Sequence, residues 1–179
     1  PEATERIKVI IEEAEEEEKK NDKENKTKVV FGGSKDVVKD EKYVPPTIIV
    51  NPTLEMKCIK EEIFGPVLPI LELPSLDEII KFINERPKPL ALYAFTDNKE
   101  EMDKIAKFTR SGDLVFNDVI VHCSVSEAPF GGVGNSGMGV AHGYQAFLSW
   151  CSQRTRVVRD GHGGVQNVDK FVRYAPYDK

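Results

Sequence analysis

Glu61-Glu-Ile-Phe-Gly-Pro-Val67 is the stretch from which the rest of the chain is interpreted, because it predicts a tight turn that feeds a strand. Gly65 permits unusual backbone angles and Pro66 fixes φ, so this pair separates two elements. The apolar run Val67–Leu73 behind it has the length of a strand. Spacing alone favours a core Phe64 beside a solvated pair of glutamates. The alternative is a ring and a carboxylate that hold a flat polar ligand.

Strands and helices alternate downstream of this turn. Two helices are expected between three strands: a helix from the capping box Ser75–Glu78 to Pro87, strand Leu90–Phe95, a helix that starts at Asp97–Glu100 and ends at its C′ residue Gly112, and strand Leu114–Phe116, which Val119–Val121 could continue. Together with the strand at Val67, this order predicts two right-handed βαβ crossovers in one parallel sheet. The fold class is therefore α/β.

A helix and two short strands are expected upstream of the turn. Residues 3–20 form the helix, whose apolar positions recur at helical spacing: Ile7, Ile10, Ile11 and Ala14. Its opposite face carries Glu12–Glu18, which we interpret as a solvated face, with a partner-binding acidic patch as the alternative. Asn21–Thr27 predicts a mobile loop. Val29–Phe31 and Thr47–Val50 predict the strands.

Composition describes an ordinary globular protein of 179 residues, 40% hydrophobic and 31% charged, with room for one domain. The net charge of −5 argues against nucleic acid as a partner, because phosphate binding needs a basic face. No apolar run approaches the ~18–20 residues that span a bilayer. Cys58, Cys123 and Cys151 are an odd number at wide spacing, which predicts free thiols in the cytoplasm or another reducing compartment.

Two motifs carry a resemblance to a known family. Glu61–Val67 resembles the signature of aldehyde dehydrogenases, and Pro129–Gly139 resembles the Pro-Phe-Gly-Gly…Ser-Gly motif near their C-terminal end. The wording of Lys88–Tyr93 and Asn117–His122 is most similar to the class 3, fatty-aldehyde-type branch. The resemblance runs from Lys28 to Trp150 and covers only the C-terminal part of the family's sequence.

This resemblance implies an organisation in three segments. Residues 1–27 form the acidic helix and mobile loop, and residues 28–150 form the incomplete C-terminal part of a βαβ parallel-sheet catalytic domain. Residues 151–179 form a tail that could contribute to an oligomer contact. In that tail, Arg154–Arg159 could be an edge strand and Phe171–Tyr174 a last short strand.

The resemblance also implies site residues. Glu62 would accept hydrogen bonds from the nicotinamide ribose hydroxyls of NAD or NADP, and Phe64 would lie against the nicotinamide ring. Asn117, Ser124 and Phe130 would line the substrate entrance. No catalytic residue is assigned in this chain, because the family's nucleophilic cysteine lies farther upstream than Pro1 would allow, as do its base glutamate and Rossmann segment.

Three other patterns are interpreted as structural. Gly132–Gly137 matches G-x-G-x-x-G, the fingerprint of dinucleotide binding, but it lacks the strand–turn–helix context of that fingerprint. We therefore expect a close-packed glycine loop. His122 and Cys123 would point to opposite faces of an extended segment, which keeps them from acting as base and nucleophile. The histidines, including His142 and His162, lack metal-ligand spacing, so no metal site is expected. All three cysteines are interpreted as buried or incidental thiols.

Two hypotheses follow. The chain is the C-terminal part of an NAD(P)-dependent aldehyde dehydrogenase, active only when a missing segment or a partner chain completes it within a homo-oligomer or larger complex. Alternatively, it is a non-catalytic structural or assembly subunit derived from such an enzyme. Both predict an exposed apolar face, because a strand like Leu90–Phe95 needs cover on both sides. The sequence specifies neither the aldehyde's chain length nor the choice between NAD and NADP.

Overall fold

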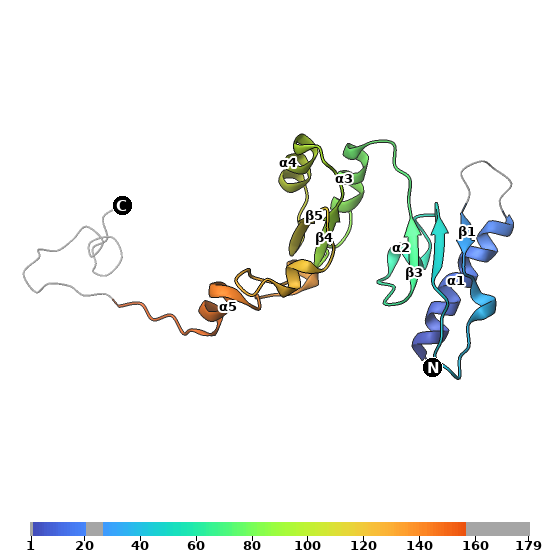
Figure 1. Cartoon of the computed structure of the whole chain (residues 1–179), viewed down its shortest axis with the longest axis horizontal. Coiled ribbons are helices and arrows are strands. Elements are labelled where there is room, and N and C mark those ends of the chain that lie inside the picture. The colour runs from blue at the N-terminus through green and yellow to red at the C-terminus, as the bar shows by residue number, and fades with distance from the viewer. Residues whose placement is uncertain (1, 21–26, 157–179) are drawn as a thin grey trace, which may run out of the picture. The chain divides into compact units, whose positions relative to one another are not determined.

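The computed structural model describes residues 2–20 and 27–156, which form two compact units. Of the described residues, those up to Phe82 form the first unit and those from Ile83 onward form the second. Figure 1 shows their helices and strands. Both units belong to the α/β class that the sequence predicted, because each combines helices with a pair of parallel strands.

The first unit is a helix on a three-stranded sheet. The sheet has the order β1-β2-β3, formed by β1 (Lys28–Phe31), β2 (Thr47–Val50) and β3 (Val67–Ile70). Strand β1 is antiparallel to β2, and β3 is parallel to β2 with Thr47 opposite Val67. The helices of this unit are α1 (Glu2–Lys20) and the short α2 (Lys57–Lys60), with a 3₁₀ turn at Ser34–Asp36. Helix α3 (Leu76–Asn84) contains the boundary between the two units.

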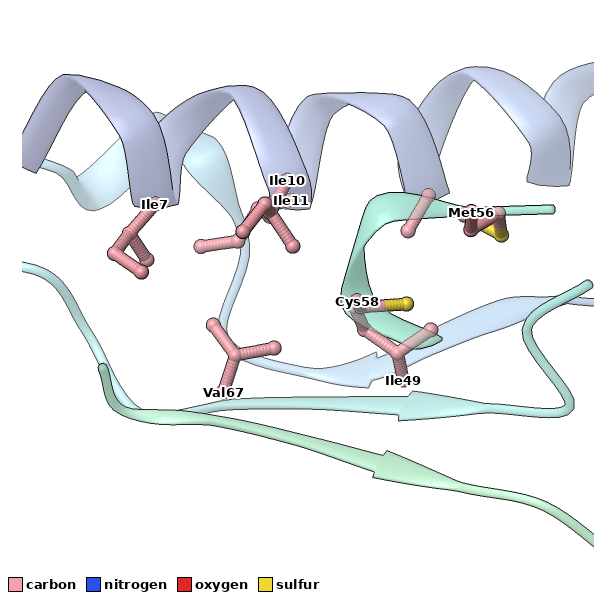
Figure 2. Packing of buried hydrophobic residues seen from close by; sticks show 8 residues of the cluster. Ile7, Ile10, Ile11, Ile49, Met56, Cys58 and Val67 are labelled. Carbon is pink, nitrogen blue, oxygen red and sulfur yellow. The ribbon is translucent and has the colours of Figure 1, made fainter. Parts of the chain in front are cut away.

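The core of the first unit lies between α1 and the sheet, as Figure 2 shows. The predicted apolar stripe of α1 is confirmed, because Ile7, Ile10, Ile11 and Ala14 are all buried. They pack with Ile49 of β2 and Val67 of β3, and Met56 and Cys58 close the cluster beside α2. Burying this face, rather than helix propensity, is what holds a helix in a folded domain.

The acidic face of α1 is not only a solvated surface. Glu15 accepts hydrogen bonds from the backbone N–H and the hydroxyl of Ser34, at 2.8 and 2.7 Å. Glu18 accepts from the N–H of Val29 at 3.3 Å, and Glu13 accepts from the N–H of Lys57 at 3.0 Å. The prediction of a merely solvated face was wrong for these three, since their carboxylates bind backbone groups that strand and turn geometry leaves unpaired.

Among its described residues, the second unit contains one βαβ crossover. Strands β4 (Ala91–Ala94) and β5 (Asp113–Phe116) are parallel, with Ala91 opposite Asp113, and α4 (Lys99–Phe108) connects them. Beyond β5 the chain forms 3₁₀ turns at Val121–Ser124 and Gly134–Ser136, and then helix α5 (Gly143–Trp150). An isolated antiparallel bridge between Phe130 and Ala141 closes the loop that contains the second of these turns.

The single parallel sheet expected through β3, β4 and β5 does not form. Strand β3 pairs with β2, whereas β4 pairs with β5 in a sheet of its own. The crossover through α4 is thus confirmed, and the crossover through α3 is not. The parallel partner of β3 is instead β2, a strand rich in β-branched residues that lies earlier in the chain, and pairing between segments distant in sequence leaves no local pattern that predicts it.

Three local expectations also need correction. Val119–Val121 does not continue β5, because Asn117 and Ile120 have left-handed φ angles of 59° and 68° that turn the chain. Helix α4 is capped by the Asn98 side chain, which accepts from Glu100 N–H at 2.9 Å, rather than by Asp97. The C-cap of this helix is Thr109 rather than a residue beside Gly112, and both the N–H and the hydroxyl of Thr109 donate to Ile105 O. The Ser75 cap of α3 is confirmed, since its Oγ accepts from Glu78 N–H at 3.3 Å.

Some predictions fall outside the described residues. They are the loop at residues 21–26, the last part of the expected edge strand Arg154–Arg159, His162 and the segment Phe171–Tyr174. Thr27, which ended the expected mobile loop, is buried and donates to the carbonyl of Asn51 at 3.0 Å. Arg154–Arg156 is described and is not a strand. In the described ranges, no helix is both long and apolar enough to cross a bilayer.

Candidate functional site

The loop of residues 61–66, hereafter the Phe64 loop, connects α2 to β3. Its beginning is fixed by the C-cap of α2, where the N–H of Glu61 donates to Lys57 O at 2.9 Å. Its end is fixed by the sheet, because Thr47 N–H donates to Pro66 O at 2.8 Å and Val67 N–H to Gly65 O at 2.9 Å. The predicted tight turn before a strand is therefore confirmed.

Phe64 lies at the tip of this loop and is not a core residue. Its side chain is 80% exposed, so the core position that spacing favoured was wrong. Its φ of 43° is in the left-handed region, which bulky residues rarely adopt because Cβ crowds the backbone. Strained backbone of this kind concentrates at ligand-binding sites, where the surrounding structure holds it. The ring is presented to solvent with a free face.

The Phe64 loop rests on the first turns of α1. Arg6 donates from Nη1 to Glu62 O at 3.3 Å and from Nη2 to Ile63 O. Gly65 packs on the side chain of Ile7, where an added Cβ would lie 2.6 Å from Cδ1. The carboxylate of Glu62 itself is on an exposed residue. Sequence reasoning missed Arg6, because its contact lies 57 residues away and leaves no local pattern.

Asn117, in the second unit, closes the end of the β4–β5 pair. Its N–H donates to Ala94 O at 2.8 Å. Its side-chain amide binds the backbone of Thr96 reciprocally, accepting from N–H at 2.9 Å and donating to O at 3.0 Å. Both polar ends of this side chain are thus engaged, and its φ of 59° makes the turn that follows. This geometry gives Asn117 a positioning role.

Ser124 and Phe130 differ in what their side chains contact. The Ser124 hydroxyl donates to Val121 O at 2.7 Å and closes the 3₁₀ turn. Phe130 is half-buried, and its ring lies in a row of aromatic side chains, 5.5 Å from His122 and 6.2 Å from the nearly parallel ring of His142. Tyr93 extends the row with an edge contact to His122. Of the two, Phe130 has the side chain that can form an apolar wall.

His122 and Cys123 are in contact, contrary to expectation. The Sγ of Cys123 lies 3.7 Å from Nε2 of His122, because a 3₁₀ turn replaces the extended segment in which neighbours diverge. The Oδ2 of Asp113 lies 3.8 Å from the same nitrogen. Asp113 Oδ2 and His122 Nδ1 are buried, and in the described ranges neither has a hydrogen-bond partner. The same ranges contain no group of ligating side chains able to hold a metal ion.

The glycine-rich segment is close-packed, as predicted. A Cβ at Gly131 would lie 2.4 Å from Gly139 O, and one at Gly132 would lie 2.1 Å from Ser136 O. The close approach of backbone therefore accounts for glycine at both positions. The segment borders an open apolar hollow of about 600 Å³, also lined by Leu90, Met138 and Trp150.

The candidate residues thus fall into two sets. Glu62 and Phe64 share the loop that Arg6 holds in the first unit, and they present a carboxylate and an open ring face. Asn117, Ser124 and Phe130 belong to the second unit, where two hold backbone turns and one joins an aromatic row. An exposed acceptor beside an exposed ring can bind a flat, hydroxyl-bearing ligand.

Comparison with known proteins gives a consistent result. The model of the aldehyde dehydrogenase family matches residues 4–156, which extends the similarity upstream of Lys28 into α1. The chain is 49% identical over 149 residues to the mouse "Aldehyde dehydrogenase, dimeric NADP-preferring", covering 83% of this chain and 32% of the relative. It is 41% identical to the Arabidopsis thaliana "Aldehyde dehydrogenase family 3 member H1", covering 88% of this chain and 31% of that protein.

A solved structure supports the same conclusion. The structure described as the substrate-bound state of Staphylococcus aureus AldH superposes with a TM-score of 0.75 at 33% identity, covering 93% of this chain and 33% of that one. The chain spans about a third of the length of these relatives. It belongs to the aldehyde dehydrogenase family and, within it, to the class 3 branch.

Proposed function

We propose that this chain is the C-terminal part of an NAD(P)-dependent aldehyde dehydrogenase that oxidises aldehydes to carboxylic acids. The observation that carries the proposal is the Phe64 loop. An aromatic ring 80% exposed, on backbone in the left-handed region and two residues from an exposed carboxylate, occupies the family's signature stretch. A strained, solvent-facing phenylalanine has no stabilising role in a core, so a ligand-binding role accounts for it.

The residues of the loop fit the nicotinamide end of NAD or NADP. Once bound, the cofactor would supply the hydride acceptor. Glu62 would accept hydrogen bonds from ribose hydroxyls, since an ionised carboxylate is a strong acceptor of such bonds. Phe64 would offer its free face to the ring and limit the orientations of the nicotinamide. The proposal covers both NAD and NADP. The name of the mouse relative describes that protein as NADP-preferring.

The substrate entrance is assigned to Asn117, Ser124 and Phe130. Phe130 would supply an apolar wall, because its ring already packs with His122 and His142. Asn117 and Ser124 would act by holding the turns that shape the entrance, since their polar atoms bind backbone groups. The family's nucleophilic cysteine, base and Rossmann segment would come from an upstream segment or a partner chain, and the mouse relative's name suggests a dimer.

Two variants of the full-length gene product test this proposal. Phe64→Ala and Glu62→Gln should each raise KM for NAD(P)⁺ about tenfold, equivalent to the loss of about 1.4 kcal/mol of binding. The measurement is NAD(P)H formation with a medium-chain or aromatic aldehyde. Phe95→Ala is the matched control, because Phe95 is also an exposed phenylalanine, 68% accessible, outside the loop. An unchanged KM in both loop variants would argue against the assignment.

A second candidate is a non-catalytic structural or assembly subunit. It is favoured by the large apolar side chains that the second unit exposes, among them Met138, Trp150 and Phe147. Surfaces of this kind mark contacts with other protein surfaces. The same assay separates the two candidates. A full-length product that oxidises no aldehyde with either cofactor, yet co-purifies in a defined complex, would favour the assembly role.

A further inference from the structure

We infer that Arg6 is a positioning residue for the cofactor-binding loop, and this inference rests on the function proposed above. Arg6 lies on α1, far in sequence from the loop, and contacts it through two hydrogen bonds to consecutive carbonyl groups, those of Glu62 and Ile63. Its proposed role is to hold Phe64 in the backbone conformation that presents the ring to nicotinamide. Arg6 would touch neither substrate nor cofactor.

The need for such a contact follows from the loop's own hydrogen bonds. One end is tied to α2 through Glu61 N–H, and the other is tied to the sheet through Gly65 O and Pro66 O. Between these ties lie Glu62, Ile63 and Phe64, which carry the site. The carbonyls of Glu62 and Ile63 accept from the guanidinium of Arg6. This side chain therefore fixes the part of the loop that lies between the backbone hydrogen bonds at its two ends.

The chemistry of arginine suits this task. Its planar guanidinium presents donors in a rigid fork, so two neighbouring carbonyls can be bound at once and their relative orientation is fixed. A lysine ammonium is a point charge on a flexible stem and fixes orientation less well. The left-handed φ of Phe64 at 43° is unfavourable for a bulky residue and persists only where surrounding contacts over-determine it. Arg6 is one such contact.

Packing against the neighbouring residue of α1 also supports the Phe64 loop. It does not replace the two hydrogen bonds of Arg6, hereafter the Arg6 clamp. Ile7 is buried beneath Gly65, where its Cδ1 would lie 2.6 Å from an added Cβ. This contact sets how closely the loop approaches the helix, but it is apolar and has no directional component. The directional information comes from the two hydrogen bonds of Arg6. The first turns of α1 thus provide the platform on which the ring is oriented.

The test compares three variants of the full-length gene product. Arg6→Met keeps the apolar stem and removes both donors, and Arg6→Lys restores the charge without the fork. Lys8→Met is the matched control, because Lys8 is another cation of α1 and pairs at 3.4 Å with Glu12 instead of the loop. The readouts are deuterium exchange of the peptide that contains residues 61–66, KM for NAD(P)⁺, KM for the aldehyde, and Tm.

Arg6→Met should increase deuterium exchange in the Phe64 loop and raise KM for NAD(P)⁺ about tenfold, because a loop without the hydrogen bonds of Arg6 misplaces the Phe64 ring. KM for the aldehyde should be unchanged. Arg6→Lys should recover part of both effects, and Lys8→Met should show neither. Unchanged loop exchange in Arg6→Met, or increased exchange throughout the first unit with a matching fall in Tm, would overturn the inference. Wild-type protein that turns over neither cofactor would instead refute the proposed function, while loop exchange would still test the clamp.

Discussion

At the scale of single residues, Cys58 shows how burial controls the chemistry of a thiol. Its side chain is only 4% exposed and packs in the core of the first unit. Burial, with the nearby carboxylate of Glu13, raises the pKa of the Cys58 thiol from 9.0 to about 11. A nucleophile must be a thiolate, so Cys58 is unreactive at neutral pH. This agrees with its interpretation as a buried thiol.

The raised pKa predicts a loss of stability at alkaline pH. The neutral thiol is favoured in the folded state, so its contribution is fully present below pH 9 and is lost as pH rises toward about 11. The free energy of unfolding of the first unit should therefore fall by an additional ~2–3 kcal/mol across this window relative to Cys58→Ala. Urea unfolding followed by circular dichroism at several pH values gives the slope of the free energy of unfolding against pH for wild type and for Cys58→Ala.

Comparing slopes removes the constant cost of the smaller alanine side chain. Other groups titrate in the same window in both proteins, and their contributions cancel in the difference. Cys151→Ala is the matched control, because Cys151 is exposed and lies outside that core. Parallel pH profiles for wild type and Cys58→Ala would contradict the prediction.

At the scale of elements, Gly112 is required for a reason other than helix capping. It follows α4 and precedes β5, where a Cβ would lie 2.2 Å from Gly131 O and 2.5 Å from Leu90 O. Both atoms belong to the backbone and cannot move as a flexible side chain would. Gly112 therefore lets the start of β5 approach two other pieces of backbone: the residue before β4, Leu90, and the glycine-rich segment at Gly131. Its function is close packing of three pieces of chain.

Alanine substitutions at two glycines separate close packing from backbone conformation. Gly112→Ala should destabilise the second unit by about 3 kcal/mol, because the clash forces backbone to shift. Gly139→Ala is the matched variant, since nothing lies within 4 Å of its Cβ but its φ is +78°. The left-handed conformation should cost it about 1–2 kcal/mol. Urea denaturation gives both values, and a larger loss in Gly139→Ala would contradict the packing account.

The elements also show which features the sequence could predict. Helix α1 was expected at residues 3–20 and spans Glu2–Lys20, because its apolar stripe is a local pattern that the sheet then covers. The partner of β3 could not be predicted in this way, since strand pairing depends on segments distant in sequence. The crossover through α4 was predictable because its strands are consecutive in the chain.

The candidate site divides along the same line. A turn at Gly65–Pro66 was predictable from residue types, whereas the exposure of Phe64 depends on a left-handed φ that phenylalanine does not favour. The Arg6 clamp joins residues 57 positions apart, and the His122–Cys123 contact depends on a 3₁₀ turn where an extended segment was expected. Motif resemblance located the loop, and only tertiary structure revealed what holds it.

At the scale of the whole molecule, the second unit has an extensive apolar surface. Met138 is 97% exposed and Trp150 is 90% exposed, and both border the hollow beside the glycine-rich segment. Tyr144 and Phe147 of α5 are exposed as well, with their rings 6.3 Å apart. This agrees with the expectation that the chain presents an apolar face. Surfaces of this kind are energetically unfavourable in water and are usually covered by another protein surface.

Trp150 is the only tryptophan of the chain and therefore reports directly on this surface. In the 179-residue polypeptide alone, its fluorescence should be that of an indole in water and should be readily quenched by acrylamide. Labelling this chain with 5-fluorotryptophan gives a single fluorine NMR resonance. Adding an unlabelled chain that supplies the proposed upstream part should shift that resonance and protect the indole, because burial of a tryptophan removes ~150–250 Å² from water.

The oligomeric state must be measured in the same samples, because self-association would also cover Trp150. Light scattering separates the two cases: protection that appears only with the upstream part requires a complementary surface, whereas protection in the chain alone with a doubled mass requires a second copy. Trp150→Ala should weaken the relevant association, since buried aromatic residues dominate interface energetics. An indole that stays quenchable in every mixture would mean that this face is solvent-exposed in the working protein, and the apolar surface would then need another explanation.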